Sequence, residues 1–172
     1  MNLNLNELVQ QVNGEFAERF EGRNLDLICI LQPEPLLIRA DSRRIWRVLE
    51  NLYVNVCKYA MPGTRVYVDA IKKDGKIQLS IKNISENPLN FQADELTERF
   101  IRGDVSRSTE GSGLGLSIAK NLTVLQHGSF NIYLDGDLFK VTITFDEAVK
   151  EKKTMPPMIV PEAVQEEAQQ DA

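Results

Sequence analysis

EGSGLGLSIAKN, residues 110–121, places three glycines at alternate positions directly before a helix-forming run. Glycine has no Cβ, so the backbone at Gly111, Gly113 and Gly115 can turn sharply and approach a ligand closely. A helix over residues 116–125 would add unpaired N–H groups and the positive end of a dipole. The stretch is therefore typical either of an anion site, most often for phosphate, or of a flexible loop capping an ordinary helix. The glycines alone do not separate these two interpretations.

The bulk composition excludes several classes of protein. A chain of 172 residues suits one domain with a sizeable core, and its net charge of −5 gives no basic field that would favour nucleic acid. The longest apolar runs are too short to span a bilayer, and the polar, periodic residues 1–10 predict no signal peptide. Cys29 and Cys57 form no CxxC or zinc pattern, so we expect free thiols in a reducing compartment.

Hydrophobic periodicity predicts the elements of the first half of the chain. Apolar residues at helical spacing indicate two helices, the second capped by Asp41, and Asp74-Gly75 indicates the turn of a hairpin. The expected helices cover residues 5–20 and 42–60, and the expected extended pieces cover 25–31, 36–40, 66–73 and 77–84. The buried face of the hairpin would carry Val66, Val68, Ala70, Ile77, Leu79 and Ile81.

A polar stripe runs beside the apolar stripe of the second expected helix. Asn51, Asn55 and Lys58 are spaced by four and three residues, which puts them on one helix face. Asparagine is a mediocre helix former, and two of them within a helix cost a few tenths of a kcal/mol each relative to alanine. A solvated polar face explains the stripe, but Glu, Lys and Gln would build such a face at lower cost. A binding function for the stripe is the alternative.

The second half of the chain predicts a further helix and a second strand pair. Its expected elements are a short helix over 93–100, a polar surface loop over 102–109, the helix over 116–125, and alternating strands over 130–134 and 139–145. Each strand has one apolar and one polar face, so we expect helices to cover one side of the sheet. From residue 147 onward the pattern fails, and three prolines with many charges predict an acidic, disordered tail over 147–172.

Three separate stretches together resemble the sequence boxes of two-component sensor histidine kinases. NLYVNVCKYA, residues 51–60, resembles their N box; LTERFIRGDVSR, residues 96–107, resembles their F box; and GSGLGLSIAK, residues 111–120, resembles their G2 box. Their order and spacing also match, and the resemblance covers about residues 3–145. It implies a catalytic and ATP-binding domain over residues 1–146. The implied fold is α+β, a two-layer sandwich of the Bergerat (GHKL) type with a mixed sheet and helices on one face.

The resemblance also implies a role for individual residues. Asn55 would ligate Mg²⁺, Asn51 would support the phosphate site or a metal-bound water, and Lys58 would contact phosphate as a point charge. Asn51 and Lys58 are thus the implied catalytic residues, and Tyr59 would pack near the base or ribose. Backbone N–H groups for the phosphates would come from Gly111, Ser112, Gly113, Leu114, Gly115 and Leu116. Phe100 and Arg102 would anchor a mobile lid over ATP.

Two features depart from the family pattern. The family's G1 box, DxGxG, is replaced by Asn-Ile-Ser-Glu-Asn at residues 83–87, so Asn83 stands where an aspartate would bind adenine. The family's phosphoacceptor histidine lies on a separate helical hairpin that nothing in this sequence matches. His127, directly before Gly128 at the end of an expected helix, is interpreted as a turn residue. The chain is therefore expected to be a kinase fragment.

The implied function is to bind Mg-ATP and to transfer the γ-phosphoryl group to a histidine on the dimerisation domain of the same kinase, which then passes it to a response regulator. We expect a cytoplasmic part of a membrane-anchored kinase, without direct contact to membrane or nucleic acid. One alternative is a nucleotide-gated or degenerate GHKL interaction module without kinase activity. A GHKL ATPase or anti-sigma-type serine kinase is a further alternative, but those enzymes place an activating glutamate where this chain has Asn51. Glu50 lies about 100° round the helix, which argues against hydrolysis.

Overall fold

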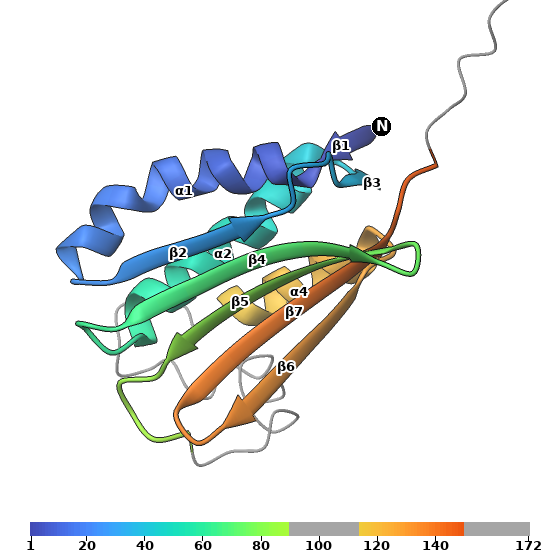
Figure 1. Cartoon of the computed structure of the whole chain (residues 1–172). Coiled ribbons are helices and arrows are strands. Elements are labelled where there is room, and N and C mark those ends of the chain that lie inside the picture. Colours follow the sequence, from blue (N-terminus) through green and yellow to red (C-terminus); the bar gives the residue numbers. More distant parts are fainter. Residues whose placement is uncertain (90–113, 150–172) are drawn as a thin grey trace, which may run out of the picture.

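The computed structural model describes residues 1–89 and 114–149. Five strands form one sheet in the order β2-β4-β5-β7-β6, with β2 and β4 parallel and all other neighbours antiparallel. Helices α1, α2 and α4 lie on the same face of this sheet (Figure 1). The elements are β1 Asn2–Asn4, α1 Leu5–Gly22, β2 Asp26–Leu31, β3 Leu37–Arg39, α2 Ser42–Tyr59, β4 Arg65–Lys73, β5 Lys76–Ile84, α4 Gly115–Leu125, β6 Ser129–Asp135 and β7 Leu138–Asp146. The predicted mixed sheet with helices on one face is therefore confirmed.

The central hairpin forms as its turn residues predict. Asp74 and Gly75 both have positive φ, 52° and 71°, which matches the twist of a tight two-residue turn between β4 and β5. The alternating apolar residues of both strands point into the helix layer and are at most 3% exposed: Val66, Val68, Ala70, Ile77, Leu79 and Ile81. The buried face predicted from the alternation is confirmed.

Helix α2 is the middle of the helix layer and runs antiparallel to α4. Asp41 caps its start by accepting a hydrogen bond of 2.9 Å from the Arg43 N–H, as predicted. The Gln126 side chain, just past the end of α4, accepts from the Asp41 N–H at 2.7 Å. At the other end of α4, Gly115 packs against Asn51. The start of α4 and the C-terminal half of α2 therefore meet at the same end of the layer.

The sequence did not reveal the strand β1. It is three residues long and pairs antiparallel with β3, which lies more than thirty residues later in the chain. A strand this short has no alternation to detect, and its pairing depends on a partner that sequence periodicity cannot supply.

The end of the domain also differs from expectation. Glu147 forms a bridge to Ile38, and the Ala148 N–H donates to the Leu37 carbonyl at 2.8 Å. Glu147 also pairs with Lys72 at 2.7 Å. These two residues, expected in the tail, thus belong to the folded domain, because β3 offers them unpaired backbone groups. The helix expected over 93–100 and residues 150–172 of the expected tail lie outside the described residues.

None of the described helices has the length and apolar character needed to cross a membrane.

Candidate functional site

The C-terminal half of α2 carries four of the predicted site residues. Asn55 is only 8% exposed, Asn51 and Tyr59 are half-buried, and Lys58 is exposed. Within the described ranges 1–89 and 114–149, the Asn55 side chain makes no hydrogen bond. The Asn51 side chain donates to the Arg47 carbonyl at 2.8 Å. Asn55 is therefore a nearly buried amide on this face of α2 that makes no hydrogen bond within the described part of the chain.

Backbone hydrogen bonds fasten the end of α2 to the end of β5. The Met61 N–H donates to the Ile84 carbonyl, and the Glu86 N–H donates to the Tyr59 carbonyl, both at 2.8 Å. A bridge joins Ala60 to Ser85 between them. Residues 83–87, where the resemblance predicts a replaced G1 box, are thereby held beside the last turn of the helix that carries the asparagine stripe.

Asn83 lies on the helix-facing side of β5 and is 3% exposed. Its Oδ1 atom is buried and has no hydrogen-bond partner among the described residues. A buried carbonyl oxygen without a donor costs about 1–3 kcal/mol, so such an atom calls for an explanation. The exocyclic amine of adenine is a donor of the right kind, and the residue present therefore fits a bound adenine.

The start of α4 is the third part of the site. Leu114, at the N-cap position, has helical φ and ψ and provides no side-chain cap. The Ile118 N–H bonds to the Leu114 carbonyl, so the N–H groups of Gly115, Leu116 and Ser117 precede the helical hydrogen-bond series. N–H groups with no partner among the described residues, together with the helix dipole, favour an anion such as phosphate at this point.

Packing inside the protein does not require a glycine at position 115. A Cβ built there would lie 3.6 Å from Asn51 Oδ1, which is an ordinary van der Waals distance. The described structure thus gives no internal reason for this glycine, and close approach of the backbone to a ligand stays the predicted reason.

The remaining predicted site residues lie outside the described ranges: Phe100, Arg102, Gly111, Ser112 and Gly113. The structure therefore brings together Asn51, Asn55, Lys58, Tyr59, Asn83 and the start of α4, with Leu114 at the N-cap position followed by Gly115 and Leu116. Glu50 is exposed on α2. This agrees with the argument against a hydrolytic glutamate on the site-facing side of the helix.

Behind the site, buried aromatic residues fix α2 against α1. The Tyr53 ring packs against Phe16 and Phe20 with centroid distances of 5.4 and 5.6 Å, and its hydroxyl donates to Asn13. Burial raises the pKa of the Tyr53 hydroxyl. Burial also raises the pKa of the Cys57 thiol, and the positive charges of Arg19 and Arg23 offset part of that rise. The helix that carries the site is therefore held by a well-packed interface.

The sequence did not single out Arg23 or Glu86, which also meet at this end of the molecule. Arg23 Nη2 donates to the Ala60 carbonyl at 3.3 Å and lies 3.6 Å from Glu86 Oε2. Arg23 is at the C-cap of α1, and Glu86 follows β5. No local pattern could have joined two residues that are more than sixty positions apart.

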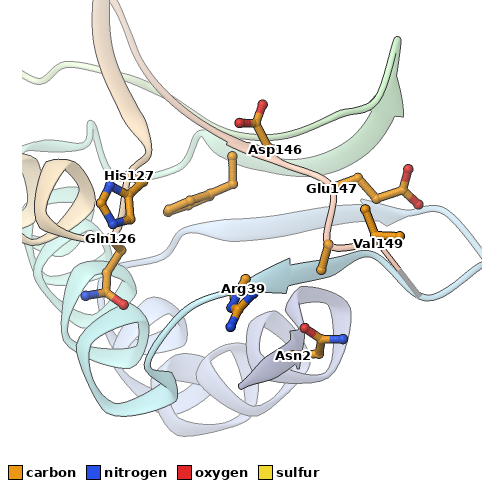
Figure 2. Close-up of a pocket in the computed structure, with 9 residues that line it drawn as sticks. Asn2, Arg39, Gln126, His127, Asp146, Glu147 and Val149 are labelled. Atoms are coloured by element: carbon orange, nitrogen blue, oxygen red, sulfur yellow. The ribbon is translucent and has the colours of Figure 1, made fainter. Parts of the chain in front are cut away.

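A separate pocket of about 510 Å³ lies at the opposite end of α4. Figure 2 shows Gln126 and His127 just past the end of α4, Arg39 on β3, Asp146 at the end of β7, and Glu147 and Val149 on the segment that follows. The length of α4, roughly 16 Å at 1.5 Å per residue, separates this pocket from the uncapped helix start. His127 has φ of 63° directly after the helix, so its interpretation as a turn residue is confirmed.

Comparison with known proteins identifies the family of the chain. Residues 40–153 match the model of the family described as histidine kinase-, DNA gyrase B- and HSP90-like ATPases. The chain belongs to this ATPase family. Curated relatives include the signal transduction histidine-protein kinase BaeS of Escherichia coli K12, which is 31% identical over 123 residues, 70% of this chain and 26% of BaeS. The sensor histidine kinase RppB of Synechocystis is 29% identical over 130 residues, 74% of this chain and 29% of RppB. The chain thus spans between a quarter and a third of the length of these relatives.

Solved structures of the family share the fold. The nucleotide-free catalytic domain of histidine kinase ThkA superimposes with a TM-score of 0.74 at 25% identity, covering 86% of this chain and 95% of that domain. The mycobacterial sensor histidine kinase MprB superimposes with a TM-score of 0.71 at 21% identity, covering 87% of this chain and 99% of that chain. The predicted resemblance to the catalytic, ATP-binding domain of histidine kinases and the predicted GHKL-type sandwich are both confirmed.

Proposed function

We propose that this chain is the ATP-binding catalytic domain of a sensor histidine kinase. It binds Mg-ATP and transfers the γ-phosphoryl group to a histidine on a separate dimerisation domain. The observation that carries the proposal is the convergence of three features at one end of the helix layer. They are the stripe on α2, the Asn83 oxygen that has no partner among the described residues, and the start of α4, which has no side-chain cap. Family membership gives this convergence its meaning, since ATP is the ligand of that family.

The asparagine stripe would hold the metal and phosphate end of the nucleotide. Asn55 would ligate Mg²⁺ through its amide oxygen, since this hard cation prefers oxygen ligands and takes the others from phosphate and water. Asn51 would position phosphate or a metal-bound water, and Lys58 would neutralise phosphate charge. Bound Mg²⁺ supplies charge stabilisation to the transferring phosphoryl group. Phosphoryl transfer asks the protein mainly for positioning and electrostatics, which is what these side chains offer.

The glycine-rich start of α4 and the end of β5 would hold the rest of the nucleotide. Asn83 would accept a hydrogen bond from the adenine amine, and Tyr59 would pack against the base or ribose. Phosphate oxygens would accept from the backbone of Gly111, Ser112, Gly113, Leu114, Gly115 and Leu116. Phe100 and Arg102 would anchor a lid over the nucleotide. The only histidine of the sequence, His127, is a turn residue, so the phosphoacceptor belongs to another domain.

The partners follow from the same proposal. The phosphoryl group would pass from the dimerisation domain to the aspartate of a response regulator, on the cytoplasmic side of the membrane. Support comes from the solved complex of histidine kinase ThkA with the response regulator protein TrrA, whose kinase chain has the same fold as this domain at 23% identity. We expect no contact of this domain with nucleic acid or with the lipid surface.

Calorimetry of Mg-ATP binding tests the proposal. The parent should bind ATP more tightly with Mg²⁺ than without it, and Asn55→Ala should abolish that difference, because the variant lacks the amide oxygen. Asn121→Ala is a matched control, since Asn121 is an exposed residue of α4, and it should bind as the parent does. Unchanged Mg²⁺ dependence in Asn55→Ala would show that the metal assignment is wrong. A parent that binds no ATP in either condition would contradict the function itself.

A further inference from the structure

Arg23 connects three segments that the candidate site depends on. It is the C-cap residue of α1, and its side chain reaches both the C-cap carbonyl of α2 and a carboxylate of the segment after β5. The shared contact atom is Nη2, at 3.3 Å from the Ala60 carbonyl oxygen and 3.6 Å from Glu86 Oε2. A single guanidinium therefore joins the helix with the asparagine stripe to the segment with Asn83.

The backbone around Arg23 is held in place. Its N–H donates to the carbonyls of Arg19 and Phe20 at 3.2 Å, and the carbonyl of the next residue, Asn24, accepts from the Gly63 N–H at 2.7 Å. Asn24 has a positive φ of 55°, which marks the sharp turn that leads into β2. Because the backbone is hydrogen-bonded at Arg23 and at the next residue, the fold fixes the position from which the Arg23 side chain extends to Ala60 and Glu86.

Folding stability does not explain the ion pair between Arg23 and Glu86. The Arg23 and Glu86 side chains are 38% and 49% exposed, and ion pairs this open to water contribute little to stability. The Arg23 Nε atom is also buried without a hydrogen-bond partner among the described residues, which is a cost. The ion pair adds little stability and comes with a desolvation cost, so it calls for another role.

The contact between Arg23 and Glu86 lies close in sequence to Asn83, the residue expected to contact the base. Glu86 is three positions after Asn83, and its N–H is bonded to the Tyr59 carbonyl of α2. Positive charge at Ala60 also suits the negative end of the α2 dipole. Loss of the Arg23 contact would therefore shift the segment 83–87 against the last turn of α2.

We propose that Arg23 is a positioning residue of the nucleotide site: together with Glu86 it holds the segment 83–87 against α2 so that Asn83 and Tyr59 face the same base. The inference rests on the proposed function. It assigns to the end of α1, outside the boxes that carry the family resemblance, a part in recognising the base end of the nucleotide. Arg23 touches neither metal nor phosphate in this assignment.

Variants that remove one property at a time test the assignment. Arg23→Met keeps much of the apolar stem but removes the charge and the donors, and Glu86→Gln keeps the shape but removes the charge. Both should weaken Mg-ATP binding by roughly two- to thirtyfold, the range seen for residues that act on a site through others. The double variant should lose no more affinity for Mg-ATP than the single variant that binds more weakly, because the two side chains act as one unit.

Two readouts separate positioning from a merely structural role. Affinity for adenosine should fall by the same factor as affinity for Mg-ATP, whereas inhibition of Mg-ATP binding by Mg-tripolyphosphate should be unaffected, because only the base end is displaced. The unfolding midpoint without ligand should change little. Lys76→Met is the matched control, because Lys76 pairs with Asp146 at the far end of the sheet and is more exposed, and it should bind all three ligands as the parent does.

The outcomes distinguish this inference from the proposed function. A parent that binds no Mg-ATP contradicts the function. A parent that binds Mg-ATP, with Arg23→Met and Glu86→Gln binding adenosine equally well, overturns only the positioning role. Equal weakening for adenosine and for tripolyphosphate also overturns it, since a general loss of structure would produce that result. Should Arg23→Met fail to fold, the Glu86→Gln titrations decide alone.

Discussion

Replacing Asn83 should change ligand-free stability and nucleotide affinity in different directions. Its Oδ1 is buried with no donor among the described residues, so the free domain bears a desolvation cost that adenine would relieve. Asn83→Ala removes the unpartnered oxygen, and Asn83→Asp replaces it with a charged acceptor. The two variants therefore separate the cost of the empty acceptor from the value of the hydrogen bond.

The magnitudes follow from burial. In Asn83→Ala, removal of an unpartnered group offsets the small cavity, so the free energy of unfolding should stay within about 1 kcal/mol of the parent. In Asn83→Asp, a carboxylate at a position only 3% exposed should lower it by about 3 kcal/mol at pH 7. Burial raises the pKa of that carboxyl in the folded state, so the loss develops as the pH rises above about 4 and vanishes below it.

Affinity should follow the opposite order. A neutral hydrogen bond contributes about 0.5–1.5 kcal/mol and a charged one about 1.5–3, so Asp should bind ATP about fivefold more tightly and Ala about fivefold more weakly than the parent. An amide can also flip and donate to the guanine carbonyl, whereas a carboxylate cannot. Asn83→Asp should therefore bind ATP over GTP more selectively than the parent does.

Unfolding and binding measurements on the three proteins check these expectations. Urea unfolding without ligand gives the stability order, and calorimetry with Mg-ATP and Mg-GTP gives the affinities. The increase in unfolding temperature at saturating Mg-ATP should rank Asp above Asn above Ala. Equal ATP affinity in all three proteins would refute the reasoning, because Asn83 would then make no contact with the base and the register assigned to the G1 segment would be wrong.

Three further predictions concern the fold and the histidine. Tyr53→Phe should have a free energy of unfolding about 1 kcal/mol lower than the parent near pH 7, because the Asn13 side chain loses its hydrogen-bond donor. The folded-state pKa of Tyr53 is raised, so the free energy of unfolding of the parent should fall as the pH rises above about 10. Plotted against pH, the values from urea unfolding for the parent and for Tyr53→Phe should therefore converge, while parallel plots would contradict this. Gly128→Ala should destabilise by about 1–3 kcal/mol, because its Cβ would lie 2.5 Å from the Phe145 ring, whereas Gly14→Ala, with nothing within 4 Å, should not destabilise. The chain alone should not autophosphorylate with labelled ATP until the dimerisation domain is added, and acid-labile label on His127 would show the opposite.

Much of the fold could be predicted from sequence because its signals are local. The helix α2 and the hairpin β4–β5 each carry their own period, cap or turn residue, as the Asp41 cap and the positive φ of Asp74 show. The strand β1 and the pairing of Glu147 with Ile38 carry no such signal. They exist because distant chain segments leave backbone groups to be paired, and only the assembled fold provides those partners.

The same division applies to the site. The stripe on α2 was visible because helix geometry fixes which residues share a face, and the site position of Asn83 followed from a resemblance rather than from its chemistry. The contact of Arg23 with Glu86 could not be predicted, because it joins the end of α1 to the segment after β5, which are distant in sequence and meet only in the folded structure. Local periodicity can indicate which side chains a helix presents, but not which distant backbone holds that helix in place.

The residues at positions 83–87, where the resemblance predicts a replaced G1 box, would act together on the bound nucleotide. In the proposed site, asparagine at position 83 would give up a charged hydrogen bond to the base but would spare the free domain a buried carboxylate. Non-glycine residues at positions 85 and 87 reduce backbone freedom. Backbone hydrogen bonds also hold the segment: the Ser85 N–H donates to the Asp137 carbonyl at 2.7 Å, and the Glu86 N–H donates to the Tyr59 carbonyl at 2.8 Å. A fastened segment loses less conformational entropy on binding. We therefore expect preorganisation to offset part of the weaker base contact, and loosening the segment through Arg23 to expose that weakness.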